Sequence, residues 1–221
     1  MSKVLVTGAS GYLGSNFIDM FYDKYEFLQF SLQKQSIESI DFHNVDVILH
    51  CAALVHQKTE YPYEKYYEIN VEYPVDLAKK AKASGVKQFV FISTIAVYGE
   101  EASNGLPRFA RNDDENKAYS NDSYNEDSIC NPVTSYGRSK LEAEQQLQAL
   151  EDENFAVSII RPPMVYGKNA PGNIESLVKL VKKVPVLPFG GIYNKRSFVY
   201  VGNLCYLIDA VIRFPVELRM T

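Results

Sequence analysis

The segment KVLVTGASGYLGSNFIDMFY, residues Lys3–Tyr22, decides the class of fold. It opens with a short apolar run from Lys3 to Thr7, as expected of a buried strand. It then continues into a helical pattern, whose apolar side is formed by Leu13, Phe17, Met20 and Phe21. A strand that turns directly into a helix is the first unit of an alternating α/β protein.

Three glycines, Gly8, Gly11 and Gly14, lie where this strand turns into this helix. In a dinucleotide-binding turn the first glycine permits the turn, the second lets the backbone approach a diphosphate, and the third lets the helix pack on the strand. The N–H groups and the positive end of the helix hold the diphosphate. The alternative is a tight turn without a ligand, but the position and context of the glycines favour dinucleotide binding.

Strands and helices alternate along the rest of the chain. EFLQFS, VDVILHCAA, VKQFVFIST and FAVSIIR read as strands, and helices are expected up to about Ser84, with a break or kink at Pro74, and over Thr134–Leu150. This order predicts an α/β, Rossmann-like doubly wound parallel sheet. We expect residues 1–161 to form it, and residues 162–221 to form a small, partial C-terminal substrate lobe from which the chain returns to the sheet.

The composition excludes several classes of protein. The chain has 221 residues and a net charge of −4, which offers no general attraction to nucleic acid or to an anionic membrane. No apolar run reaches the roughly 20 residues that span a bilayer, and a strand beginning at Lys3 leaves no room for a signal peptide. The cysteines, odd in number and widely spaced, are typical of a reduced, cytoplasmic protein.

The sequence predicts no metal site. His43, His50 and His56 lack the spacing of metal ligands, and His50 reads as a strand-end residue rather than a catalyst. The long acidic segment Gly99–Pro132 lacks the Asp-x-Asp-x-Asp-Gly order of a calcium loop. A loop of this length is usually functional or disordered.

A tyrosine and a lysine lie four positions apart at Tyr136 and Lys140, on one face of the expected helix. The same spacing occurs at Tyr61 and Lys65. Chance alone produces about one such pair in a chain of this composition, so the spacing by itself indicates no function.

In combination, these features resemble the extended short-chain dehydrogenase/reductase family, in the NAD-dependent epimerase/dehydratase group that acts on nucleotide sugars. The resemblance is to the branch that serves capsule and surface-polysaccharide synthesis. Its landmarks follow one another along the chain as TGASGYLG (Thr7–Gly14), HCAALVH (His50–His56), YYEINV (Tyr66–Val71), FISTIAVYG (Phe91–Gly99), SYGRSK (Ser135–Lys140), RPPMVYG (Arg161–Gly167) and NKRSFVYV (Asn194–Val201).

The resemblance implies a set of site residues. Tyr136 would be the acid/base, with Lys140 as its partner and Thr94 in the place of the family's catalytic Ser/Thr. Thr94, Asn173 and Arg196 would contact the substrate, although a surface role for Arg196 is as plausible. The cofactor, NAD or NADP, would be bound by Gly8, Ser10, Gly11, Tyr12, Leu13, Gly14, Ser31, Ala52, Ala53, Asn70, Tyr136 and Lys140.

Elementary electrostatics agrees with the roles of Tyr136 and Lys140. A phenol has a pKa near 10, so acting as a base at pH 7 requires about 4 kcal/mol. An ammonium about 5 Å away, at an effective dielectric constant of about 20, supplies roughly 3 kcal/mol. We therefore expect Lys140 to lower the pKa of Tyr136.

The sequence departs from the family in three places. Ser31 takes the slot of the acid that holds the adenosine 2′-hydroxyl of NAD, which, with Lys34 nearby, makes NADP acceptable. The connection Leu32–Asn44 is too short for the usual helix, strand and helix, so we expect the third strand to be lost or abbreviated. The family also continues beyond the end of this sequence, so we expect a truncated substrate lobe.

The function expected from the resemblance is hydride transfer at C4 of a nucleotide sugar, which is expected to be a UDP-sugar. A 4-epimerase and a 4-keto reductase both fit; a 4,6-dehydratase fits less well, because Thr94 is followed by Ile95 and Ala96 rather than by Asp-Glu. A sensor or scaffold that binds a dinucleotide without turnover is the alternative from another class. Family members also dimerise through helices that correspond to residues 62–84 and 134–151, so a homodimer is possible.

Overall fold

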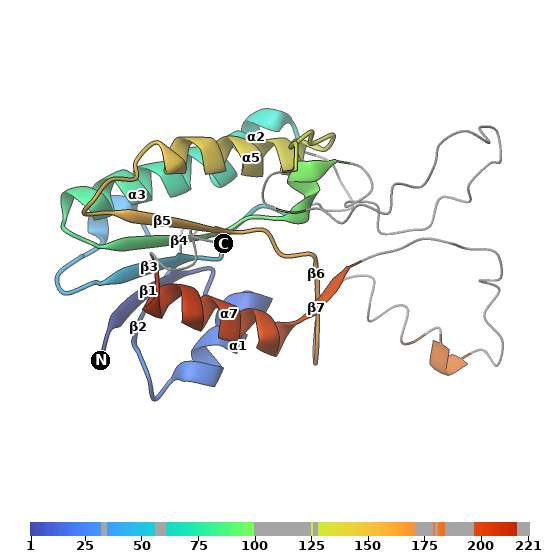
Figure 1. Ribbon diagram of the computed structural model, residues 1–221, viewed down its shortest axis with the longest axis horizontal. Helices are drawn as coiled ribbons and strands as arrows, with labels where there is room; N and C mark the ends of the chain where they lie inside the picture. The colour runs from blue at the N-terminus through green and yellow to red at the C-terminus, as the bar shows by residue number, and fades with distance from the viewer. Residues whose placement is uncertain are drawn as a thin grey trace.

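The centre of the molecule is a five-stranded parallel sheet with the strand order β2-β1-β3-β4-β5 (Figure 1). The computed structural model describes residues 1–31, 35–55, 61–99, 125, 128–170, 179, 181–183 and 197–215. The strands are β1 (Lys3–Thr7), β2 (Glu26–Phe30), β3 (Val47–His50), β4 (Gln88–Ile92) and β5 (Ala156–Ile160). Because all of them run in one direction, their carboxyl ends meet at one edge, where ligands of such sheets bind.

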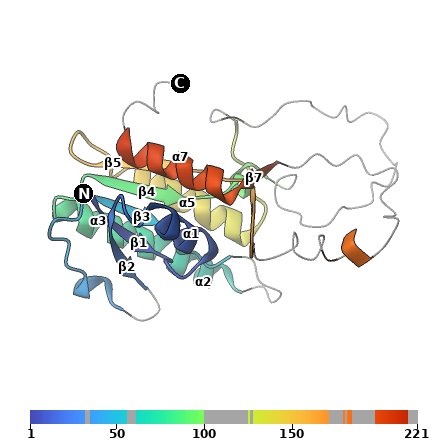
Figure 2. The same cartoon turned by 90° about the horizontal axis from the view of Figure 1, so that it is seen from below.

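Helices cover both faces of the sheet (Figures 1 and 2). One face carries α2 (Tyr63–Tyr67), α3 (Tyr73–Ala83) and α5 (Ser135–Gln148), and the other carries α1 (Tyr12–Phe21) and α7 (Val201–Arg213). A separate parallel pair, β6 (Met164–Tyr166) with β7 (Phe198–Tyr200), precedes α7. The predicted doubly wound sheet is confirmed. None of the described helices is long and apolar enough to cross a membrane.

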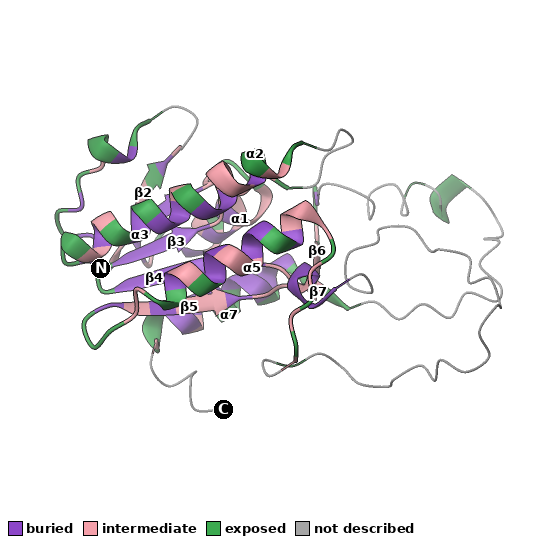
Figure 3. Ribbon diagram, turned by 90° about the horizontal axis from the view of Figure 1, so that it is seen from above, coloured by how far each residue is buried: buried purple, intermediate pink, exposed green. Residues whose placement is uncertain are grey.

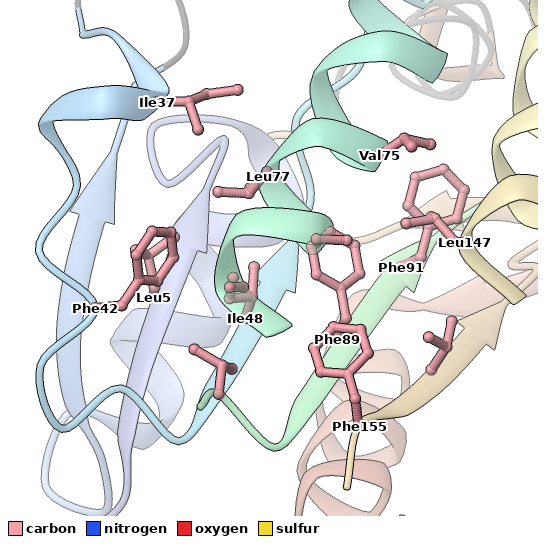
Figure 4. Packing of buried hydrophobic residues seen from close by; sticks show 14 of the residues in the cluster. Leu5, Ile37, Phe42, Ile48, Val75, Leu77, Phe89, Phe91, Leu147 and Phe155 are labelled. Carbon is pink, nitrogen blue, oxygen red and sulfur yellow. The ribbon is translucent and has the colours of Figure 1, made fainter. Parts of the chain in front are cut away.

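Each strand contributes to two cores, because alternate side chains point to opposite faces. Leu5, Ile48 and Phe89 pack under α3 and α5, whereas Val4 and Val6 pack under α1 and α7. Figure 4 shows the first of these cores, and Figure 3 shows buried strands beneath helices whose outer surfaces are exposed. Burying one such side chain contributes about 1.5–3 kcal/mol, so both helical layers are held firmly to the sheet.

The third strand of the usual arrangement is absent from the described residues, as the short connection predicted. Between β2 and β3 the chain forms a single 3-10 turn, η1 (Ile37–Ser39), whose buried Ile37 joins the core under α3. In the described part of the chain, β2 is consequently the edge of the sheet on this side.

Of the break or kink expected at Pro74, the break is wrong. The chain stays helical from α2 through a π-helical turn, η2 (Glu68–Glu72), into α3, where Pro74 occupies the first turn. The N–H of Tyr73 donates to the carbonyl of Glu68, five residues back. Proline has no N–H to donate to Asn70, and the wider turn accommodates that loss without ending the helix.

A buried carboxylate joins the last described helix, α7, to the segment that follows α1. Asp209 of α7 is 3% exposed, and its Oδ1 accepts hydrogen bonds from Lys24 Nζ at 2.5 Å and from the Tyr25 hydroxyl at 2.6 Å. Its Oδ2 accepts from Arg213 Nε at 3.1 Å. These contacts fasten α7 beside α1, the helix that follows the glycine turn.

Candidate active site

The glycine turn is sterically determined. Gly8 has a φ of +68°, and a β-carbon on it would lie 2.7 Å from the backbone nitrogen of Ala52. A β-carbon on Gly14 would lie 2.4 Å from the carbonyl oxygen of Gly8. Both positions therefore require glycine, the first for the turn beside β3 and the second for the packing of α1 on β1.

Gly11 has a different environment, which fits an anionic ligand. It is exposed, and a β-carbon on it would contact only the carbonyl oxygen of Gly8, at 3.1 Å. Gly11 is the N-cap of α1, where no side chain accepts a hydrogen bond from the helix and no acid lies in the first turn. The N–H groups of this turn can hold a diphosphate, with Ser10 exposed beside them.

The Tyr12 ring connects this turn to β6 and β7. Its hydroxyl is buried and has no hydrogen-bond partner among the described residues. A β-carbon on Gly167, which follows β6, would lie 2.6 Å from that hydroxyl. Burial, followed by the effect of Tyr200, raises the pKa of Tyr12.

His50 ends β3 as a buried, neutral residue. Its Nδ1 lies 3.0 Å from Thr7 Oγ1, and its ring stacks on Phe89 and Phe91. Burial, followed by the charge of Lys140, lowers the pKa of His50 to about 3. Ala52 donates its N–H to Thr7 Oγ1 at 3.4 Å, so this edge is held beside the glycine turn.

Thr94 and Tyr136 meet although they come from different elements. Thr94 follows β4, and Tyr136 lies in the first turn of α5, whose N-cap Thr134 accepts a hydrogen bond from the N–H of Gly137 at 3.0 Å. Burial raises the pKa of Tyr136 to about 12, and its hydrogen bond with Thr94 opposes that rise. The phenol is therefore protonated at neutral pH.

Lys140 differs from the expectation. It is 1% exposed, its Nζ lies 4.0 Å from the centroid of the Phe91 ring, and burial lowers its pKa to about 7. Lys140 is not among the groups that shift the pKa of Tyr136. The expected lowering of the Tyr136 pKa by Lys140 is wrong for the protein alone, because the amine is directed to the aromatic core.

Asn70 lies in the π-helical turn and joins three parts of the site. Its Oδ1 accepts from the N–H of Leu54 at 2.8 Å, and its Nδ2 donates to the Leu54 carbonyl at 3.0 Å and to Ser139 Oγ at 3.0 Å. Asn70 thereby ties the segment after β3 to α5, one residue before Lys140. This geometry indicates a positioning role and adds nothing in favour of direct cofactor contact.

A buried ion pair that the sequence pattern did not predict lies behind Lys140. Glu144, 1% exposed, accepts hydrogen bonds from Arg161 Nε at 3.0 Å and from Arg161 Nη2 at 2.6 Å. Arg161 Nη1 also donates to the Tyr98 hydroxyl at 2.7 Å. The sequence feature that could have indicated this ion pair is the position of Glu144 one helical turn after Lys140, on the buried face of α5.

The remaining predicted residues lie at the periphery or outside the described residues. Ser31 directly follows β2; its N–H donates to Gln35 Oε1 at 3.0 Å. Leu13 and Ala53 are half-buried near the glycine turn and β3. His56, Lys34, Asn173, Arg196 and most of Gly99–Pro132 lie outside the described residues.

The fold is that of a Rossmann-like α/β protein with a glycine turn at the carboxyl edge of its sheet. The family model described as NAD dependent epimerase/dehydratase family matches residues 4–219. The chain belongs to this family.

Relatives of known description agree with this membership. The chain is 38% identical over 236 residues to a UDP-glucose 4-epimerase of Vibrio cholerae, covering 96% of this chain and 67% of that protein. It is 25% identical to an N-acetyl-alpha-D-glucosaminyl-diphospho-ditrans,octacis-undecaprenol 4-epimerase of Escherichia coli O157:H7, covering 93% of this chain and 62% of that protein. The chain thus spans about two thirds of the length of these relatives.

A solved structure has the same fold. The UDP-glucuronic acid 4-epimerase of Bacillus cereus, crystallised with NAD, superposes with a TM-score of 0.72 at 21% identity, covering 96% of this chain and 74% of that one.

Proposed function

We propose that this chain binds NAD or NADP at the glycine turn and serves a nucleotide-sugar 4-epimerase. The observation that carries the proposal is the approach of Thr94 to Tyr136 at the carboxyl edge of the sheet, close enough for Thr94 to lower the pKa of the phenol. Two hydroxyl groups thus lie at the same edge of the sheet as the Gly8–Gly14 turn, where a sugar hydroxyl and a dinucleotide can be bound together. The relative at 38% identity, a UDP-glucose 4-epimerase, supports a UDP-sugar as substrate.

In this proposal the dinucleotide, when bound, exchanges a hydride with a sugar carbon, which we assign to C4. Tyr136 holds the proton that leaves or returns to the hydroxyl oxygen on that carbon. Thr94 donates a hydrogen bond to the same oxygen and keeps it within reach of the Tyr136 hydroxyl.

Because the pKa of Tyr136 is high, donating its proton and accepting a proton place different demands on the site. A protonated phenol with a pKa of about 12 can donate its proton at neutral pH without further change. To accept a proton it needs a nearby positive charge, because burial disfavours the phenolate. Lys140, four residues along the same helix, is the cation that we assign to this task once it turns from Phe91 toward the ligand.

A 4-keto reductase is the second candidate, and Ser31 is the observation that favours it. The residue after β2 carries no carboxylate to hold an adenosine 2′-hydroxyl or to repel a 2′-phosphate. NADP therefore fits, and a reductase that consumes NADPH would use the same Tyr136 and Thr94.

One experiment separates the proposals. The protein is incubated with UDP-glucose, UDP-galactose and their N-acetyl and uronic acid counterparts, with each oxidised and reduced cofactor. Proton NMR of the sugar signals detects epimers, and nicotinamide absorbance detects net reduction. Interconversion without net cofactor use supports the epimerase, and stoichiometric oxidation of the cofactor supports the reductase. Cofactor binding without either reaction would leave the sensor as the function, and absence of binding would overturn the dinucleotide site.

A further inference from the structure

Among the residues that the structure describes, the surroundings of Lys140 offer it no free anion. Its charge acts on His50, which ends β3 and is neutral, and on Cys51, which follows β3 and whose thiol pKa burial raises to about 12. On β4 it faces the ring of Phe91. On its own helix, Tyr136 has a raised pKa and is uncharged at neutral pH.

Glu144 is the one carboxylate, within the described part of the chain, that acts on Lys140. It lies one turn further along α5 and raises the pKa of Lys140. No ion pair joins these two described residues. Arg161 instead donates to both carboxylate oxygens: Nε lies 3.0 Å from Oε1, and Nη2 lies 2.6 Å from Oε2. A bidentate guanidinium contact of this kind is a strong and directional one.

In addition to Glu144, Tyr98 contacts the Arg161 guanidinium. Its Nη1 donates to the Tyr98 hydroxyl at 2.7 Å, and its guanidinium lies 5.0 Å from the Tyr98 ring centroid. Tyr98 ends the 3-10 turn η3 (Ile95–Tyr98), which begins directly after Thr94. The guanidinium is thus fixed between α5 and the segment that carries Thr94, with its charge directed at Glu144.

We propose that Arg161 is a positioning residue for Lys140: by occupying both oxygens of Glu144, it denies Lys140 an internal ion-pair partner and keeps the amine available to a bound ligand. The inference rests on the proposed binding of a dinucleotide beside Lys140. A buried lysine paired with a buried carboxylate would have to break that pair before it could reach a ligand. Arg161 removes this competition.

Removal of Arg161 should let Glu144 capture Lys140. In Arg161→Gln we expect the pKa of Lys140 to rise by at least about one unit, measured by NMR titration of labelled lysine ε-carbons, with Lys140→Met assigning the signal. The affinity for NAD should fall about tenfold in calorimetric titration, which corresponds to about 1.4 kcal/mol. Adding Glu144→Gln to this variant should bring both quantities back toward their wild-type values.

Two further variants complete the experiment. Lys82→Gln breaks the ion pair between Lys82 and Asp152, whose Nζ and Oδ2 are 2.6 Å apart, without touching the surroundings of Lys140, and should change neither quantity. If Arg161→Gln does not fold, Glu144→Gln alone tests the same electrostatics and should lower the pKa of Lys140 below its wild-type value.

The outcomes separate this inference from the proposed function. The NMR arm needs no ligand, so wild-type protein that binds neither NAD nor NADP would overturn only the dinucleotide site and the affinity arm. An unchanged Lys140 titration in Arg161→Gln would overturn the positioning role. So would a double variant that binds NAD as weakly as Arg161→Gln, because Arg161 would then act on the ligand or on the fold rather than through Glu144.

Discussion

Gly137 lies directly against the carbonyl oxygen of Ala96: a β-carbon on Gly137 would be 2.8 Å from that oxygen. This contact lets the first turn of α5 approach the segment after Thr94 closely enough for Thr94 to lower the pKa of Tyr136. The glycine inside the Tyr-x-x-x-Lys segment is therefore part of the site geometry.

Gly137→Ala should separate Tyr136 from Thr94, because backbone atoms cannot yield to the added carbon as a flexible side chain would. A displacement of the order of 1 Å can cost about 10²-fold in rate, so we expect kcat to fall tenfold or more with a smaller change in cofactor affinity. Gly85→Ala is the control for a general loss of stability, because its φ of +86° strains an alanine although the β-carbon meets nothing within 4 Å. Circular dichroism must show that both variants fold. Equal kcat values for both variants would contradict the geometric role.

Tyr136→Phe should abolish turnover and leave the cofactor bound. The phenyl ring keeps the packing and removes only the hydroxyl that transfers the proton, so the rate should drop about 10²–10⁴-fold. Tyr63→Phe is a suitable comparison, because the Tyr63 hydroxyl donates to Glu142 on the outer side of α5 and should not affect kcat. Near-normal turnover of Tyr136→Phe would remove this residue from the mechanism.

Gly11→Val should prevent dinucleotide binding in a protein that still folds. Gly11 has a φ of −76°, which valine adopts without strain, and its β-carbon would meet only the Gly8 carbonyl oxygen at 3.1 Å. The isopropyl group would instead fill the space that a diphosphate needs. Circular dichroism checks the fold and calorimetry the binding; undiminished affinity would show that the diphosphate lies elsewhere.

Ser31→Asp should shift the preference from NADP to NAD. We expect the wild-type protein to bind NADP several-fold more tightly than NAD, or at least equally well. The reason is that a partly exposed contact between the protein at Ser31 and the 2′-phosphate is worth about 1 kcal/mol. An aspartate would repel that phosphate and accept a hydrogen bond from the 2′-hydroxyl. Ser31→Ala, which removes the hydroxyl without adding charge, is the control. A wild-type preference for NAD, or an unmoved ratio in Ser31→Asp, would refute the assignment.

His50 should make the protein sensitive to acid. Its pKa is about 3 in the folded chain, against about 6.5 when unfolded, so the unfolded chain binds more protons between these values. The free energy of unfolding should therefore fall as pH drops through this range, with His50 contributing about 2 kcal/mol of the loss between pH 7 and pH 5. Urea unfolding of His50→Asn should show a free energy of unfolding that depends less steeply on pH than that of the wild-type protein. Identical slopes for the two proteins would mean that His50 can be protonated in the folded state.

Local steric rules made the glycine turn predictable from the sequence, whereas the electrostatics of the site could not be predicted from it. Gly14 is required by its contact with the Gly8 carbonyl oxygen, six residues earlier, and the φ of +68° at Gly8 is a property of the turn itself, so the spacing of these glycines indicated the turn. The contact of Gly8 with Ala52 depends on the assembled sheet. The pKa of Lys140 depends on Glu144, and Glu144 depends on Arg161, which lies beyond an intervening strand. The aromatic ring that Lys140 faces belongs to yet another strand. Such pairings arise only when the sheet has assembled.

Pro74 shows a second limit. A proline in a helical pattern normally predicts a break, and nothing local indicated that a π-helical turn would absorb it. The tertiary contacts of Asn70 with Leu54 and Ser139 hold that turn in place. The helix therefore continues where the local pattern predicted an interruption.

The contact of Asp209 with Lys24 and Tyr25 has a consequence for how the chain reaches its native state. These partners are 185 and 184 positions apart, so the loop between them encloses most of the protein. During synthesis the part of the sheet that α7 covers stays exposed until α7 has left the ribosome, and closing so long a loop is slow. We expect this late docking of α7 to limit the refolding rate, and the half-finished chain to be the species that a chaperone would bind.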